Sequence, residues 1–147
     1  MTIDVEDYFQ VAALARWAPT SNWDDFDLRV EQNTDRILQL FDQHGIKATF
    51  FVLGWIADKC PALVQKIVAE GHELACHGYS HQLIYNQTPE VFREETLRSK
   101  KLLEDIGGVA VNGYRAASYS ITKQSLWALD IIAEAGFTYD SSIFPVK

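Results

Sequence analysis

The sequence has few of the residues that stabilise small secreted domains or metal clusters. Only two cysteines, Cys60 and Cys76, occur in 147 residues, which is too few for a disulfide framework or for a zinc site made of cysteines alone. We expect both to be small buried apolar residues. No stretch of 18 apolar residues is present, and so we expect no transmembrane helix.

Positive charge is also scarce. The chain has 13 Lys and Arg residues against 20 Asp and Glu residues, a net charge of −7, and its basic residues form no cluster. A chain of this charge is a poor partner for nucleic acid or for an anionic membrane. Residues 1–7 carry acids and no basic residue, unlike a signal peptide. We therefore expect a cytoplasmic protein that binds neither partner.

The remaining composition is that of an ordinary globular protein. Apolar residues make up 48% of the chain and charged residues 22%, which excludes a disordered, collagenous or coiled-coil chain. The length suffices for one domain over residues 1–147, with a sizeable core.

Strand and helix signals alternate along the chain. Short β-branched or apolar runs predict strands at residues 2–5, 47–53, 73–76, 109–114 and 137–140. Periodic apolar positions bounded by capping residues, Pro or Gly predict helices at residues 33–44, 61–70, 88–106 and 122–135. Residues 8–30 show no clean period, and we expect a long, functional loop there.

The alternation predicts parallel strands joined by right-handed crossovers. Residues 47–53 form a strand without polar alternation, which is typical of a parallel sheet covered by helices. Two α/β architectures fit this order, an open doubly wound sheet and a (β/α) barrel. Because a full eight-unit barrel needs roughly 200 residues or more, five strands would form an incomplete barrel.

Ionisable side chains follow most of the predicted strands, where parallel α/β folds place their functional groups. In chain order they are Asp4, Glu6, Asp7, His77, His81, Arg115, Tyr119 and Asp140. Since the carboxyl ends of parallel strands share one rim, we expect these groups to lie near one another.

His77 and His81 are candidate metal ligands, because on a helical turn their i, i+4 spacing puts both imidazoles on one face. This spacing also occurs in unrelated surface or core histidines, and the nearby acids favour the metal. Two histidines and one carboxylate leave positions open on Zn²⁺ or a similar ion for water and substrate. The carboxylate is Glu6 or Asp7, and we favour Glu6. Asp4 would then act as general base or orient the water.

The direction of Asp7 depends on where the first strand ends. Asp4 and Glu6 point the same way, because strand side chains alternate. If the strand persists to Tyr8, Asp7 faces away from them. If it ends at Val5, Asp7 can turn inward.

Other residues have two possible roles. Arg115 either holds a carboxylate such as Asp4 or binds a substrate oxygen, and the backbone N–H of Tyr119 is placed to donate to an oxyanion. Trp55, with Trp17 and Trp23, falls in a predicted loop, where aromatics stack on sugars or act as buried anchors. We do not expect His44 or His72, each beside a glycine at a helix end, to belong to the site.

Several segments in order resemble the NodB-homology polysaccharide deacetylases, carbohydrate esterase family 4. They are residues 2–7, 47–54, 71–81, 113–119 and 139–142. The first segment is most similar to the subgroup associated with exopolysaccharide and exosortase systems. The resemblance implies a distorted (β/α)₇ barrel, seen here as an incomplete one, and a divalent metal, usually zinc, held by a carboxylate and two histidines. It also implies hydrolysis of N-acetyl groups on an amino-sugar polysaccharide, with Tyr119, Asp140 and Trp55 contacting the substrate.

The sequence departs from the family pattern at three places. Val5 stands where the family has a second aspartate, which leaves the metal carboxylate open between Glu6 and Asp7. Ala117 replaces a common proline. The family's last motif, with a general-acid histidine, has no counterpart, and so we expect a C-terminally truncated chain that is inactive alone. Two other functions fit, an allantoinase-like hydrolase of a small cyclic amide and an inactive carbohydrate-binding relative.

Overall fold

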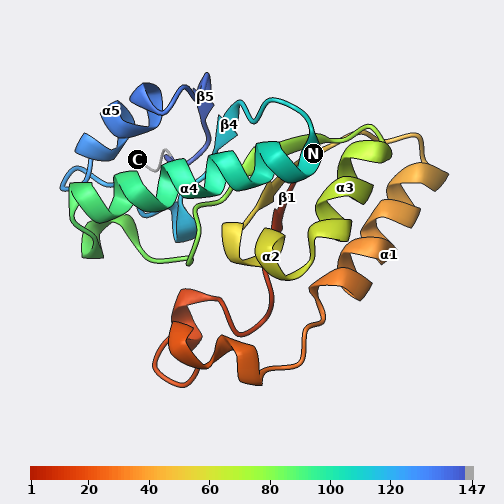
Figure 1. Cartoon of the computed structure of the whole chain (residues 1–147), viewed down its shortest axis with the longest axis horizontal. Helices are drawn as coiled ribbons and strands as arrows, with labels where there is room; N and C mark the ends of the chain where they lie inside the picture. Colours follow the sequence, from red (N-terminus) through yellow and green to blue (C-terminus); the bar gives the residue numbers. More distant parts are fainter. Residues whose placement is uncertain (145–147) are drawn as a thin grey trace.

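The computed structural model describes residues 1–144, and its strands form one parallel sheet (Figure 1). The strands are β1 (Thr2–Val5), β2 (Thr49–Val52), β3 (Glu73–Cys76), β4 (Gly113–Tyr114) and β5 (Tyr139–Asp140). They lie in the order β1-β2-β3-β4-β5, and every neighbouring pair is parallel. A doubly wound sheet reverses its strand order at a switch point. This unreversed order is that of a partial (β/α) barrel, as expected.

Five α-helices within the described residues connect and cover the strands. They are α1 (Val30–Gln43), α2 (Gly54–Lys59), α3 (Pro61–Ala69), α4 (Pro89–Gly107) and α5 (Trp127–Glu134). The longest, α4, packs against α2, α3 and α5, and α1 and α3 lie side by side in Figure 1. None of the helices in residues 1–144 is long and apolar enough to cross a membrane.

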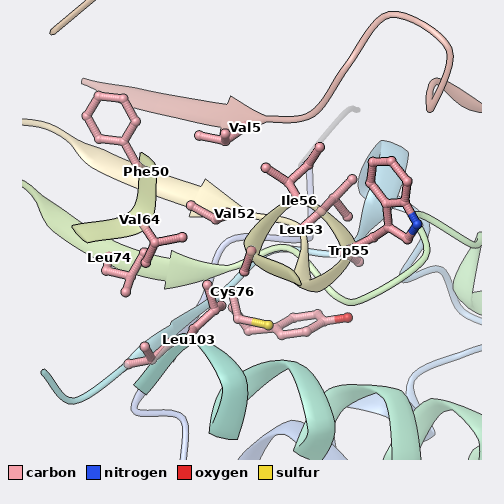
Figure 2. Packing of buried hydrophobic residues seen from close by; sticks show 14 of the residues in the cluster. Val5, Phe50, Val52, Leu53, Trp55, Ile56, Val64, Leu74, Cys76 and Leu103 are labelled. Carbon is pink, nitrogen blue, oxygen red and sulfur yellow. The ribbon is translucent and has the colours of Figure 1, made fainter. Parts of the chain in front are cut away.

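The core lies between the sheet and these helices. Alternate strand residues, among them Val5, Val52 and Cys76, point toward the helices and are at most 1% exposed. Figure 2 shows them packed with Ile56 of α2 and Leu103 of α4. Because strand side chains alternate, the residues between them, such as Asp4, face the other side of the sheet. The core thus fixes which side chains are available to a site. Cys60 and Cys76 are buried and unbridged, as expected.

Helix α4 begins and ends for the predicted reasons. Thr88 Oγ1 accepts a hydrogen bond from the Val91 N–H, Pro89 is the first helical residue, and Gly108 ends the helix in the left-handed conformation with φ 65°. Its inner residues, including Phe92 and Thr96, are buried. This face of α4 lines the region behind the candidate site.

Other boundaries differ from the predictions. Helix α1 begins at Val30, three residues before the predicted cap, because a distant carboxylate caps it. Helix α2, which was not predicted, starts without a side-chain cap: the N–H groups of Gly54 and Trp55 donate to the carbonyls of residues 78 and 79. Helix α5 starts at Trp127 rather than after Thr122.

The last two strands are shorter than predicted, with two residues each. The expected loop before α1 contains two short 3₁₀ helices, η1 (Ala12–Leu14) and η2 (Thr20–Asp25). It projects to one side of the helical layer in Figure 1. Residues 145–147 of the predicted domain lie outside the described part of the chain.

Candidate metal centre

Glu6, His77 and His81 converge at the carboxyl end of the sheet. Each offers one ligand atom, and these atoms all lie within 4.8 Å of one another. Glu6 comes directly after β1 and His77 directly after β3. The two imidazole rings have centroids 5.3 Å apart, and both histidines are less than 10% exposed. The structure thus brings together the three groups that were expected to share an ion.

A backbone carbonyl fixes the proton position of His77. Its Nδ1 lies 2.7 Å from the Arg115 carbonyl oxygen. Because a carbonyl can only accept, Nδ1 carries the proton and Nε2 keeps a free lone pair, which is the usual arrangement of a metal-binding histidine. Burial lowers the pKa of His77, although Asp4 acts in the opposite direction. The ring is therefore neutral at neutral pH, as a metal ligand must be.

Glu6 supplies the negative charge of the cluster. Burial raises its pKa, but the close contact with His81 and the charges of His81 and His77 outweigh burial and lower the pKa overall. Its Oε2 lies 2.8 Å from His81 Nε2, yet no donor among residues 1–144 meets it with hydrogen-bond geometry. A buried, unpartnered carboxylate oxygen facing two imidazoles is a donor set that suits zinc. The residues present therefore fit a divalent metal.

Asp7, the alternative ligand, lies outside this cluster. Although β1 ends at Val5, Asp7 does not turn toward the histidines. Its Oδ2 accepts hydrogen bonds from the N–H groups of Arg29 at 2.7 Å and Val30 at 2.9 Å, and its Oδ1 accepts from the N–H of Tyr8. Asp7 thus caps α1 from outside the helix. Of the two carboxylates considered, the structure groups Glu6 with the histidines and engages Asp7 with backbone amides, so we retain Glu6 as the candidate ligand.

Asp4 lies beside the cluster, paired with Arg115. Arg115 Nη1 donates to Asp4 Oδ1 at 2.6 Å, while the Asp4 side chain remains 30% exposed. Asp4 also acts on the charge state of His77. Of the two roles considered for Arg115, the structure shows the first, which is to hold the carboxylate of Asp4. A carboxylate oriented in this way beside a metal site can accept a proton from water.

Residues that were not selected from the sequence complete the setting of Arg115. Its Nη2 donates to Thr2 Oγ1 at 3.2 Å and to Ser141 Oγ at 2.8 Å, and its guanidinium lies 4.1 Å from the centre of the Phe51 ring. Thr2 lies on the same face of β1 as Asp4, and the alternation of strand side chains could have predicted this. Ser141 directly follows β5 at the rim. Its polar side chain at a strand end was the feature of the sequence that could have identified it.

Tyr119 and Asp140 occupy the rim with partners of their own. The Tyr119 N–H donates to the Ala116 carbonyl at 3.3 Å, in a turn where Ser118 and Tyr119 have φ values of 50° and 52°. This amide would have to leave its partner to reach an oxyanion. The Asp140 carboxylate accepts from the N–H and Oγ of Ser142. Substrate contacts by either residue remain predictions.

Trp55 does not lie in a loop, and its expected position is corrected. It belongs to α2, is 8% exposed, and packs edge-on against Phe9 and Trp23 with ring centroids 6.0 Å and 5.4 Å away. The buried-anchor alternative fits Trp55 and Trp23, because their rings pack in the core. Trp17 is 70% exposed. His72 is buried and accepts from the Ala48 N–H, and His44 ends α1, both as expected.

The arrangement has the parts needed for metal-assisted hydrolysis. A carboxylate and two imidazoles can hold an ion while leaving coordination positions open. A second carboxylate stands beside them, fixed by a buried guanidinium. This set of groups matches hydrolysis of an amide or ester and offers no nucleophilic serine or cysteine among the clustered residues.

Comparisons with known proteins point in the same direction. The family described as Polysaccharide deacetylase matches residues 20–139. The chain is 34% identical over 98 residues to a peptidoglycan-N-acetylglucosamine deacetylase of Bacillus cereus, covering 66% of this chain and 36% of that protein. It is 31% identical over 100 residues to a chitooligosaccharide deacetylase of a Bradyrhizobium species, covering 68% and 43%. The chain therefore spans less than half the length of these relatives.

Solved structures agree with the fold. A Mycobacterium smegmatis protein matches with a TM-score of 0.78 and 30% identity, covering 97% of this chain and 49% of that one. A peptidoglycan N-acetylglucosamine deacetylase matches with a TM-score of 0.69 and 28% identity, covering 95% and 53%. The family match extends over most of the chain. The chain belongs to the polysaccharide deacetylase family, the NodB-homology group of carbohydrate esterase family 4.

Proposed function

We propose that the protein is a metal-dependent hydrolase that removes N-acetyl groups from an amino-sugar polysaccharide. The observation that carries this proposal is the convergence of Glu6, His77 and His81 beside the Asp4–Arg115 pair. The relatives are named as deacetylases of peptidoglycan and of chitooligosaccharide, which supports an N-acetylated glycan as the substrate class.

Zinc is the metal that the donor set favours, since two imidazoles and one carboxylate are a common catalytic zinc set. Glu6, His77 and His81 would hold it. When bound, the metal supplies Lewis-acid polarisation of the amide carbonyl and acidifies water.

The chain's own residues carry out the proton handling and positioning. Asp4 would accept the proton of the attacking water at its carboxylate, in a side chain that is open enough to reach solvent. Arg115 keeps the Asp4 carboxylate in place through a charge-assisted hydrogen bond. The Tyr119 N–H would first give up its hydrogen bond to the Ala116 carbonyl. It would then donate to the tetrahedral oxyanion and stabilise it.

The finer substrate assignment rests on the first motif. The run Asp4-Val5-Glu6-Asp7 is most similar to the subgroup associated with exopolysaccharide systems, and we propose an exopolysaccharide or a peptidoglycan-type polymer. The structure gives Asp7 a capping role in this run, which explains why an acid follows the metal-facing Glu6.

Metal content and product release test the proposal together. Purified protein should contain about one zinc per chain, and this zinc should be lost in His77→Ala and His81→Ala. Zinc-loaded protein should release acetate from N-acetylglucosamine oligomers and should not open a cyclic ureide. Ureide opening without acetate release would favour an allantoinase-like activity. Wild-type protein that binds no metal would contradict the proposal and favour an inactive carbohydrate-binding relative.

A further inference from the structure

A small cavity adjoins the metal centre and is lined by both His77 and His81. It lies between the loop that follows β3 and the inner face of α4, and its volume is about 10 Å³. Polar side chains line much of it, including Gln87, Glu95, Thr96 and the buried Tyr114. A cavity of roughly this volume holds one water molecule, provided that it offers that water several polar partners.

Three buried polar atoms on the lining residues have no partner among residues 1–144. They are His81 Nδ1, Gln87 Oε1 and Thr96 Oγ1. Each would be costly to leave unpaired, because a buried polar group that has lost its water and found no hydrogen-bond partner destabilises the folded state. Three such atoms on the lining of one water-sized cavity indicate a shared partner rather than three separate defects.

The two histidines of the metal centre differ in whether Nδ1 has a hydrogen-bond partner within the described residues. His77 has the partner that metal-binding histidines require, because its Nδ1 donates to the Arg115 carbonyl at 2.7 Å. His81 uses Nε2 toward Glu6, at 2.8 Å, so its Nδ1 needs a partner in the cavity. Glu95 also lines the cavity and accepts from Ser80 Oγ at 2.7 Å, which anchors the residue next to His81.

We propose that one water bound in this cavity accepts the Nδ1–H of His81 and is held by Thr96 Oγ1 and Gln87 Oε1. Thr96 and Gln87 are then positioning residues for His81, acting through the water and not on the substrate. The inference rests on the proposed metal-dependent function. Both residues lie beyond the loop that carries the two histidines, and Thr96 is 1% exposed on α4, so α4 supports the metal centre from behind.

The test combines a crystal structure with zinc affinity. In metal-free wild-type crystals, an ordered water should lie within hydrogen-bond distance of His81 Nδ1, Thr96 Oγ1 and Gln87 Oε1. Thr96→Val keeps the side-chain shape but removes the hydroxyl, and it should lose this water and weaken zinc binding about 10- to 100-fold. Thr96→Ser keeps the hydroxyl and should bind zinc like the wild type.

Two further variants separate positioning from a general loss of stability. Thr34→Val changes a buried threonine of α1 that does not line the cavity, and it should leave zinc affinity unchanged. Gln87→Leu, at a half-buried site, gives a second test if Thr96→Val does not fold. Zinc affinity in Thr96→Val or Gln87→Leu equal to wild type would overturn the inference, as would a wild-type crystal without a water on His81 Nδ1. Wild-type protein that binds no zinc would overturn the proposed function, and the crystallographic water would then still decide whether α4 positions His81.

Discussion

Arg115 joins the two halves of the candidate site, because its side chain holds Asp4 and its backbone holds His77. The guanidinium donates to Asp4 Oδ1 at 2.6 Å, across 111 positions of the chain, while the Arg115 carbonyl accepts from His77 Nδ1 at 2.7 Å. One residue therefore orients both the proposed base and a proposed ligand. The backbone contact survives substitution of the side chain, which makes the two roles separable.

Arg115→Met should uncouple these roles. The side chain of Asp4 loses its partner, so acetate release should fall by about 100-fold or more, the usual contribution of a positioned general base. Zinc stoichiometry should stay at the wild-type value, because the carbonyl that orients His77 remains. Arg115→Lys keeps the charge but not the planar fork of donors, and its acetate release should lie between that of the wild type and that of Arg115→Met. Loss of zinc in Arg115→Met would show that the side chain also shapes the metal centre.

Glu6→Gln and Asp7→Asn should have opposite consequences, although the residues are adjacent. Glu6→Gln removes the only carboxylate of the cluster and should abolish stoichiometric zinc binding, with little effect on urea unfolding of the metal-free protein. Asp7→Asn weakens the cap of α1 and should lower the free energy of unfolding by about 1–2 kcal/mol, with zinc retained. Elemental analysis and urea denaturation measure both. Zinc loss in Asp7→Asn with zinc retained in Glu6→Gln would reverse the assignment.

The metal-free protein should lose stability as pH falls below about 6.5. Burial lowers the pKa of both His72 and His77 in the folded state. Below the unfolded-state pKa the unfolded chain binds protons that the folded chain does not, and so the free energy of unfolding decreases. Burial raises the pKa of Glu95, and this shift acts in the opposite direction: the stability that it contributes is present below the unfolded value of 4.5 and is lost as the pH rises.

Urea unfolding midpoints measured in chelator between pH 8 and pH 5.5 check this expectation. His72→Gln should flatten the pH dependence in part, because one of the two contributing rings is gone, while His44→Gln, on the exposed end of α1, should not change it. A midpoint that stays constant or rises as the pH falls would show that neither buried imidazole resists protonation.

Local patterns in the sequence were sufficient for the elements whose signals lie within them. The run at β2 and the Thr88-Pro89 start of α4 predicted the right elements because alternation, capping and helix termination are short-range effects. The start of α1 could not be predicted in this way, since its cap comes from Asp7, more than 20 residues away. Helix α2 has no cap residue, and only the backbone of a neighbouring loop satisfies its first amides.

The candidate site was predictable as a group of residues but not in its details. Glu6, His77 and His81 converge because the carboxyl ends of parallel strands share a rim. The choice between Glu6 and Asp7 depended on the chain path after β1, which follows from the capping of α1 and not from strand parity. The sequence predicts a loop at Trp55 because the helix that carries it has no sequence signal of its own; the burial of Trp55 fits the buried-anchor alternative.

The turn that carries Tyr119 offers a test of strain at the site. Ser118 adopts φ 50° and ψ 31°, a left-handed conformation that costs a non-glycine residue about 1–2 kcal/mol, and its side chain is exposed. Ser118→Gly relieves this cost but gives the unfolded chain more freedom, worth about 0.4–1 kcal/mol. The free energy of unfolding should therefore rise by roughly 0.5–1 kcal/mol, being the difference between these two effects. Ser118→Val, with a β-branched side chain, should lower it.

Measuring the activity of Ser118→Gly shows whether the left-handed turn at Ser118 contributes to the reaction or only connects two elements. If the turn positions the Tyr119 amide for an oxyanion, the more flexible Ser118→Gly should show a lower kcat at unchanged zinc affinity. Urea denaturation and acetate release on the same zinc-loaded samples measure both quantities. A stabilised Ser118→Gly with full kcat would mean that the left-handed turn is structural only, because relief of its strain would then cost the reaction nothing.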